Sequence, residues 1–102
     1  MASIPELNKQ LKIQKEIIDY CKLRGAIVFR MNAGSAKYNI KLAPKGTPDL
    51  LVVMESRSFW IEIKTPKGKV KPDQEKMHTD LREKGQRVYV CRSVEELIEV
   101  IE

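Results

Sequence analysis

Two acidic residues, each in or beside a short apolar run, are the best candidates for chemistry in this sequence. Asp49 precedes the run from Leu50, and Glu62 lies inside the next β-rich stretch. Hard divalent cations are held by one or two carboxylates together with water and substrate phosphate. The sequence therefore predicts a Mg²⁺ or Mn²⁺ site at Asp49 and Glu62, with the backbone carbonyl of Ile63 as a further oxygen ligand.

Lys64 follows Glu62 by two residues, and strand side chains alternate between faces, so both side chains would share one face of the sheet. A lysine placed there could orient or deprotonate a water nucleophile, or neutralise charge that builds on a phosphate. Unaided phosphodiester hydrolysis is so slow that it needs this kind of electrophilic stabilisation. The combination of two acids and a lysine indicates phosphodiester hydrolysis.

Basic residues lie on both sides of this acidic group along the chain. We interpret them as a phosphate-binding cradle, which would fix the position of a nucleic acid without reading its sequence. Tyr38 is a candidate for stacking on a base. The chain has a formal net charge of +5, which alone is weak evidence for a polyanionic partner. The predicted DNA-binding residues are Arg30, Lys37, Tyr38, Lys41, Lys45, Lys67, Lys69 and Lys71.

The elements that must position these residues follow from periodicity and capping signals. Ser3 with Glu6 is typical of a helix start, and glycines at 25 and 85 mark two helix ends. The predicted order is α-β-β-β-α-β-α, which favours a mixed sheet with helices packed on it. The predicted ranges are helix 5–23, strands 26–31, 50–54 and 59–64 with a four-residue turn at 55–58, helix 72–84, strand 87–91 and a helix from 94 onward.

Apolar positions predict which faces are buried. In the third strand Phe59, Ile61 and Ile63 alternate with polar residues and should face the core. The first helix shows a broad apolar arc at helical spacing. This arc comprises Leu7, Leu11, Ile13, Ile17, Ile18, Tyr20 and Cys21.

Three further residues have alternative interpretations. Gln74 lies on the inward face of the second predicted helix with Leu81, and a glutamine aimed inward needs a polar partner. His78 shares that face, and we interpret it as a packed, hydrogen-bonded residue outside the site. Trp60 is on the face of Glu62 but is expected to lie in the core or an interface.

The 102 residues fit one small domain, 1–102, and no run is apolar enough for a membrane span or a signal peptide. We therefore expect a cytoplasmic protein with no membrane partner and no small-molecule cofactor. Cys21 and Cys91 are far apart in sequence, and the chain has one histidine, which argues against structural zinc. Free thiols are the simpler interpretation.

The motif pattern resembles the PD-(D/E)xK nuclease superfamily, and within it the small virus-type replication-repair nuclease (VRR-NUC) branch, whose fold is related to archaeal Holliday-junction resolvases. Four features carry this resemblance over nearly the whole chain. They are Glu16 in the first helix, Gly46-x-Pro48-Asp49, Glu62-x-Lys64, and Gln74 followed by Leu81 and Gly85. The resemblance implies an α/β fold with a restriction-endonuclease-like αβββαβ core, a mixed central sheet flanked by helices, and an extra C-terminal helix.

The resemblance also implies roles for single residues. Asp49 and Glu62 would be metal ligands, Lys64 the water-activating residue, and Glu16 an indirect metal contact, through water or through another ligand. Gln74 would orient Lys64 or the scissile phosphate. The expected reaction is Mg²⁺- or Mn²⁺-dependent cleavage of DNA that leaves a 5′-phosphate, and a standalone nuclease of this size suggests a phage source.

The chain leaves no room for a separate sequence-reading domain, so DNA shape should set selectivity. A branched junction such as a Holliday junction needs two matched cuts, which a C2 homodimer would deliver. The apolar side of the last helix, with Phe59 or Ile61, is a candidate dimer surface unless it covers the sheet. Two alternatives remain: a flap, nicking or restriction-like nuclease, and a non-catalytic nucleic-acid-binding module.

Overall fold

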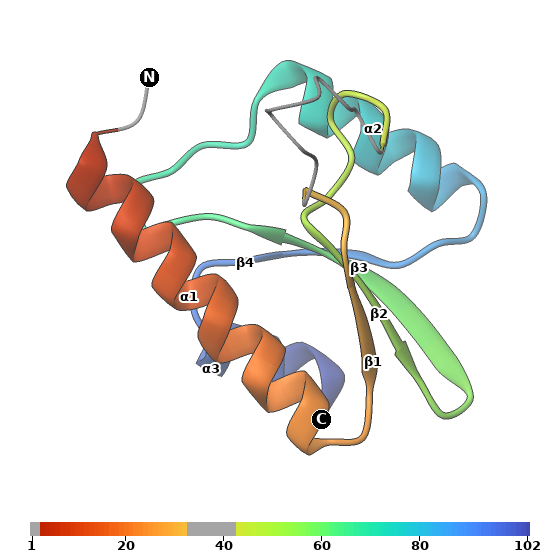
Figure 1. Cartoon of the computed structure of the whole chain (residues 1–102). Helices are drawn as coiled ribbons and strands as arrows, with labels where there is room; N and C mark the ends of the chain where they lie inside the picture. Colours follow the sequence, from red (N-terminus) through yellow and green to blue (C-terminus); the bar gives the residue numbers. More distant parts are fainter. Residues whose placement is uncertain (1–2, 33–42) are drawn as a thin grey trace.

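In the described part of the chain, three helices and four strands occur in the predicted order (Figure 1). The computed structural model describes residues 3–32 and 43–102. Lys37, Tyr38 and Lys41 lie outside these residues. The elements are α1 (Ile4–Leu23), β1 (Ile27–Arg30), β2 (Leu50–Met54), β3 (Arg57–Ile63), α2 (Pro72–Glu83), β4 (Val88–Cys91) and α3 (Val94–Ile101).

The strands form one mixed sheet in the order β1-β2-β3-β4. The β1–β2 and β2–β3 pairs are antiparallel, and β4 pairs parallel to β3 after the crossover through α2. The turn between β2 and β3 is shorter than the predicted four residues, because β3 already begins at Arg57. Ser56 adopts a positive φ of 67°, which lets the chain reverse within Glu55 and Ser56.

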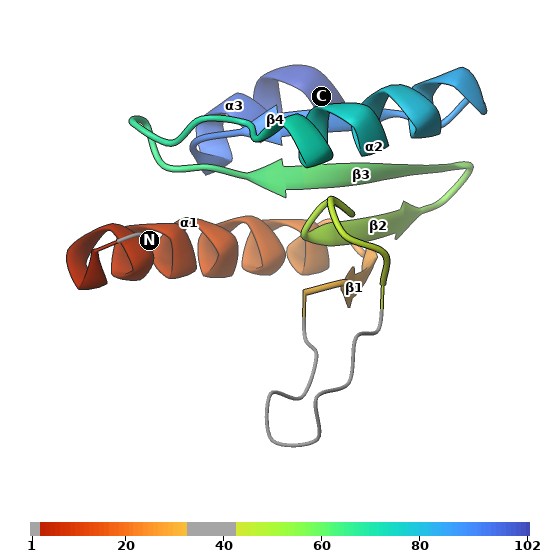
Figure 2. The same cartoon turned by 90° about the horizontal axis from the view of Figure 1, so that it is seen from above.

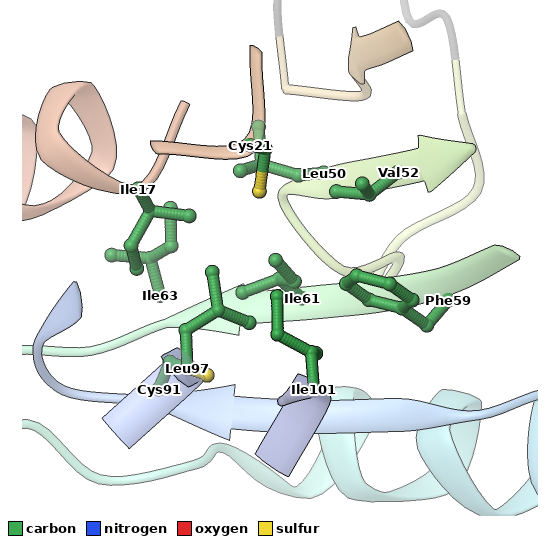
Figure 3. Packing of buried hydrophobic residues seen from close by; sticks show 10 residues of the cluster. All are labelled: Ile17, Cys21, Leu50, Val52, Phe59, Ile61, Ile63, Cys91, Leu97 and Ile101. Carbon is green, nitrogen blue, oxygen red and sulfur yellow. The ribbon is translucent and has the colours of Figure 1, made fainter. Parts of the chain in front are cut away.

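The core lies on the sheet face that α1 and α3 cover. Figure 3 shows side chains of α1 (Ile17, Cys21) and of α3 (Leu97, Ile101) in one cluster with side chains of β2, β3 and β4. Phe59, Ile61 and Ile63 are buried here, as their alternation predicts. Because Phe59 and Ile61 are buried and the apolar side of α3 covers the sheet, the candidate dimer surface that combined them is wrong.

The N-terminal half of α1 is less buried than its apolar arc predicts. Leu7 and Leu11 are about half exposed, whereas Gln14 is buried beside Ile17 and Cys21. The reason is that this half of the helix lies beside the end of β3 and the residues that follow it: Gln10 donates to the Ile63 carbonyl, and Glu6 contacts the Thr65 hydroxyl. Polar pairing replaces apolar packing there.

Helix α2 lies on the sheet face opposite to α1 and α3: it lies above the strands in Figure 1, with α1 and α3 below them, and passes in front of β4 in Figure 2, seen from above. Gly25 and Gly85 follow α1 and α2 with positive φ, as the helix-stop signals predict. The thiols of Cys21 and Cys91 are free and buried. Within residues 3–32 and 43–102, no helix is long and apolar enough to cross a bilayer.

Candidate active site

Asp49 and Glu62 face each other at the end of the β2–β3 hairpin. The register pairs Leu50 with Ile61, so the next residues along the hairpin, Asp49 and Glu62, are opposite one another. Asp49 Oδ2 accepts a hydrogen bond from the backbone N–H of Ile63 at 2.7 Å. This bond ties the first acid to the strand that carries the second, so the hairpin itself brings the two predicted ligands together.

Glu62 is almost fully buried, with 2% of its surface exposed. Burial and the neighbouring charge of Asp49 raise the pKa of Glu62 to about 8, and Lys64 opposes this shift. A buried carboxylate beside another carboxylate is unfavourable unless a cation balances the charge. The electrostatics of the pair therefore favour a bound positive charge.

Lys64 is held by Gln74. The Nζ of Lys64 donates to Gln74 Oε1 at 2.8 Å and lies 3.8 Å from Glu62 Oε2. The same Gln74 oxygen accepts from the backbone N–H of Lys71 at 2.9 Å, as expected for the third residue of a helix. Gln74 thus fixes the position of Lys64 from the start of α2. Lys64 is the polar partner that an inward-facing glutamine requires.

A chain of side-chain amides supports Asp49 and Ile63 from the side of α1. Asn32 donates to Asp49 Oδ1 at 3.1 Å and to Gln14 Oε1 at 3.0 Å. Gln10, one turn before Gln14, donates to the Ile63 carbonyl at 3.1 Å. The predicted third oxygen ligand is therefore hydrogen-bonded, with a second lone pair left.

The loop before β2 packs against the start of α2 through Gly46. A Cβ at Gly46 would lie 2.3 Å from the Asp73 carbonyl oxygen and 3.3 Å from the Gln74 nitrogen. Gly46 also has a φ of 88°, which favours glycine. This close approach sets the position of Asp49, three residues later, relative to Gln74.

Glu16 does not reach the other site residues. It is exposed on α1, whereas Gln10 and Gln14 mark the side of the helix that contacts the site. Glu16 comes two residues after Gln14, about 200° around the helix. The α1 glutamate that does approach is Glu6, whose carboxylate contacts the Thr65 hydroxyl.

A cleft of about 310 Å³ opens beside Lys64. Lys69 and Lys71 line it, whereas Lys67 is exposed outside it. Lys45 is exposed in the loop before β2, and Arg30 lines a separate groove with Leu11 of α1. The cleft is therefore basic on the side of the 65–71 loop. Its lining residues are Glu6, Gln10, Lys64, Thr65, Gly68, Lys69, Lys71 and Gln74.

The donor set fits Mg²⁺ or Mn²⁺ better than zinc. In the part of the chain that the structure describes, no group of three or more His, Cys, Asp or Glu side chains could hold a metal ion. Two carboxylates and a carbonyl are hard oxygen donors, which suit a cation that keeps several waters.

Several contacts at the site had no clear signal in the sequence. His78 is packed and hydrogen-bonded as predicted, but its partner is Glu62 itself, with Nε2 3.3 Å from Oε1. Asn32, Gln10 and Gln14 were not predicted either, because an isolated amide leaves no periodic pattern. The one available signal was spacing, since Gln10 and Gln14 lie one turn apart, as do Gln74 and His78. Trp60 is half-buried and contacts Gln86.

Comparisons with known proteins identify the family of this chain. The sequence profile of the VRR-NUC domain matches residues 6–95. A solved structure described as a VRR_NUC domain superposes with a TM-score of 0.72 at 24% identity, covering 91% of this chain and 94% of the other. No curated protein matches. The chain therefore belongs to the VRR-NUC domain family and is a nuclease of the PD-(D/E)xK type.

Proposed function

We propose that this nuclease is a Mg²⁺- or Mn²⁺-dependent endonuclease that cuts branched DNA, such as Holliday junctions, as a homodimer. The observation that carries the metal dependence is the Asp49–Glu62 pair, in which burial and like charge disfavour ionisation of Glu62. Asp49, Glu62 and the Ile63 carbonyl would hold the cation. When bound, the cation would neutralise phosphate charge and make water more acidic.

Lys64 acts next to this pair. Gln74 fixes its Nζ through a 2.8 Å hydrogen bond, and the lysine side chain is nearly buried. The fixed ammonium group can therefore donate to the attacking water or to a phosphate oxygen with little rearrangement. The adjacent cleft is lined by Lys69 and Lys71, which can bind the neighbouring phosphates of the DNA strand.

The decisive experiment is cleavage of a panel of four-way junctions, flaps, linear duplexes and single strands with Mg²⁺ or Mn²⁺ at low salt. We expect Asp49→Asn to reduce cutting by several orders of magnitude while it retains or improves DNA binding, because the substitution removes negative charge near phosphate. Lys64→Ala should also lose cutting. Normal cutting by both variants would show that the assigned site is wrong.

The panel also separates the alternatives. Faster cutting of a four-way junction than of its linear arms supports junction selectivity. Equal rates on junction and arms would instead support a restriction-like nuclease, and preferred cutting of flaps a flap nuclease. Binding without cutting of any substrate would identify a non-catalytic module.

The dimer would form through the sheet face that α2 leaves open. Ile27 and Phe29 of β1 are 62% and 50% exposed, and the register places them on one face with Leu51, Val53 and Trp60. None of the five side chains is charged, so this face suits another apolar surface better than DNA. A copy of the same face would pair with it about a twofold axis.

Light scattering after size exclusion tests this surface. We expect twice the 11.8 kDa mass of one chain for the wild type and a monomer for Phe29→Glu. Glu55→Lys, in the exposed β2–β3 turn, is the control and should stay dimeric. A monomeric wild type at assay concentrations would contradict the dimer.

A further inference from the structure

His78 is the one histidine of the chain, and it is buried against the proposed metal ligand. It lies on α2 with 2% of its surface exposed, and its Nε2 is 3.3 Å from Oε1 of Glu62. A buried imidazole at this distance from a carboxylate is a hydrogen-bond partner.

The two oxygens of Glu62 have different neighbours. His78 contacts Oε1, whereas Gln74 Nε2 lies 3.5 Å and Lys64 Nζ 3.8 Å from Oε2. Gln74 and His78 are four residues apart, so both project from one face of α2. Helix α2 therefore contacts the carboxylate at both oxygens and limits its rotation.

We propose that His78 is a positioning residue, which donates from Nε2 to Oε1 of Glu62 and thereby holds the carboxylate in the orientation in which it would bind the cation. This inference rests on the proposed function, because it takes Glu62 as a metal ligand. Partners of ligating carboxylates fix the orientation of the ligand, and their loss typically weakens metal binding by about 10- to 100-fold. His78 itself does not touch the cation.

Two substitutions separate positioning from simple packing. His78→Leu keeps an apolar body of similar size without a donor, whereas His78→Gln offers an amide donor at a comparable reach. Mn²⁺ binding to the full chain is measured by calorimetry without DNA, and thermal unfolding shows that each variant is folded. Thr79→Ala is the matched control, because Thr79 lines the same 300 Å³ cleft as His78 but is exposed.

We expect His78→Leu to weaken Mn²⁺ binding by about 10- to 100-fold, and His78→Gln and Thr79→Ala to remain within about threefold of wild type. Wild-type affinity in folded His78→Leu, or equal losses in the Leu and Gln variants, would overturn the inference. A wild type that binds no divalent cation would instead overturn the proposed function.

The single histidine permits a test without substitution. In the Mg²⁺-saturated wild type, ¹⁵N NMR of the imidazole should show the Nε2–H tautomer, since an ionised Glu62 can only accept. A Nδ1–H tautomer in the Mg²⁺-bound protein would overturn the inference even if His78→Leu failed to fold.

Discussion

Glu62 is the residue whose chemistry differs most from its ordinary behaviour in water. It is buried, faces Asp49, and contacts Lys64, Gln74 and His78. Because burial and Asp49 outweigh the attraction of Lys64, the metal-free protein holds a proton on Glu62 at neutral pH. A cation held by the proposed site would have to displace this proton, which would couple metal binding to pH.

We expect the metal-free protein to become less stable as the pH rises from about 6.5 to about 8, since at lower pH the lowered pKa of His78 acts on stability with the opposite sign. The pKa of Glu62 is 4.5 as a free group and about 8 when folded, so between these values Glu62 binds more protons in the folded state than in the unfolded state. Stability then falls with pH and the full loss is present above about pH 8. Each pKa unit corresponds to about 1.4 kcal/mol, which makes the loss a few kcal/mol at most.

Urea unfolding in EDTA across this range measures the effect. Glu62→Gln should remove most of the slope and be more stable than wild type at high pH, because it carries no charge to bury. Glu16→Gln, on the exposed side of α1, should keep the wild-type slope. A wild-type stability that rises between about pH 6.5 and 8 would contradict the assigned environment of Glu62.

At the scale of elements, the sequence predicted the order of helices and strands and the acids at the hairpin. Alternation placed Phe59 and Ile61 in the core, and the bounds of β2 agree with the predicted range. The turn was predicted too long because Ser56 adopts a positive φ that serine rarely takes. Leu7 and Leu11 are half exposed. Periodicity therefore predicts which face of a helix is apolar, but not how far along the helix that face stays in contact with the sheet.

The residues around the acids were predicted less well, for a physical reason. Glu16 was chosen by resemblance, and its position two residues from Gln14 turns it away from the site. The contacts of Gln10 and Asn32 depend on how α1 lies against the end of β3, which single-residue propensities do not specify. Gln74 was predictable because a polar residue on an apolar face needs a partner.

The contact between the loop that contains Gly46 and the start of α2 should affect the cleavage rate as well as the stability of the fold. In Gly46→Ala, the new methyl group must push away the Asp73 carbonyl and with it the start of α2, where Gln74 holds Lys64. We expect a loss of about 1–3 kcal/mol in stability. Cleavage at a temperature where the variant is folded should fall by at least about tenfold.

Gly25→Ala is the matched control for Gly46→Ala. Gly25 has nearly the same φ, 83° against 88°, but nothing lies within 4 Å of the position that an added methyl group would take. It should therefore lose stability from backbone strain alone and keep its cleavage rate when folded. Equal losses of cleavage rate in the two variants would show that the close contact between Gly46 and the start of α2 does not affect cleavage.

At the scale of the whole molecule, positive charge lies beside the acidic pair, on the side of the 65–71 loop. Lys69 and Lys71 line the cleft next to Lys64, while Lys22 lies at the far end of α1 (Figure 1). DNA binding through this cleft should release counterions, so log affinity falls with log salt by about 0.9 per phosphate neutralised.

Substitution of single lysines tests this arrangement. In an Asp49→Asn background, which permits binding without cleavage, Lys69→Ala and Lys71→Ala should each reduce the salt slope by about 1. Lys22→Ala should leave it unchanged. Fluorescence anisotropy with a labelled junction over a salt series measures the slopes, and a slope near zero in the parent protein would contradict the cradle.

The two buried thiols have a practical consequence for experiments on core opening. Burial raises the pKa of Cys21 to about 11 and that of Cys91 to about 12, so neither forms the reactive thiolate in the native state. Alkylation therefore has to wait until the core opens, at α1 for Cys21 and at β4 for Cys91. The rate of thiol labelling at each position therefore measures how often that element separates from the sheet.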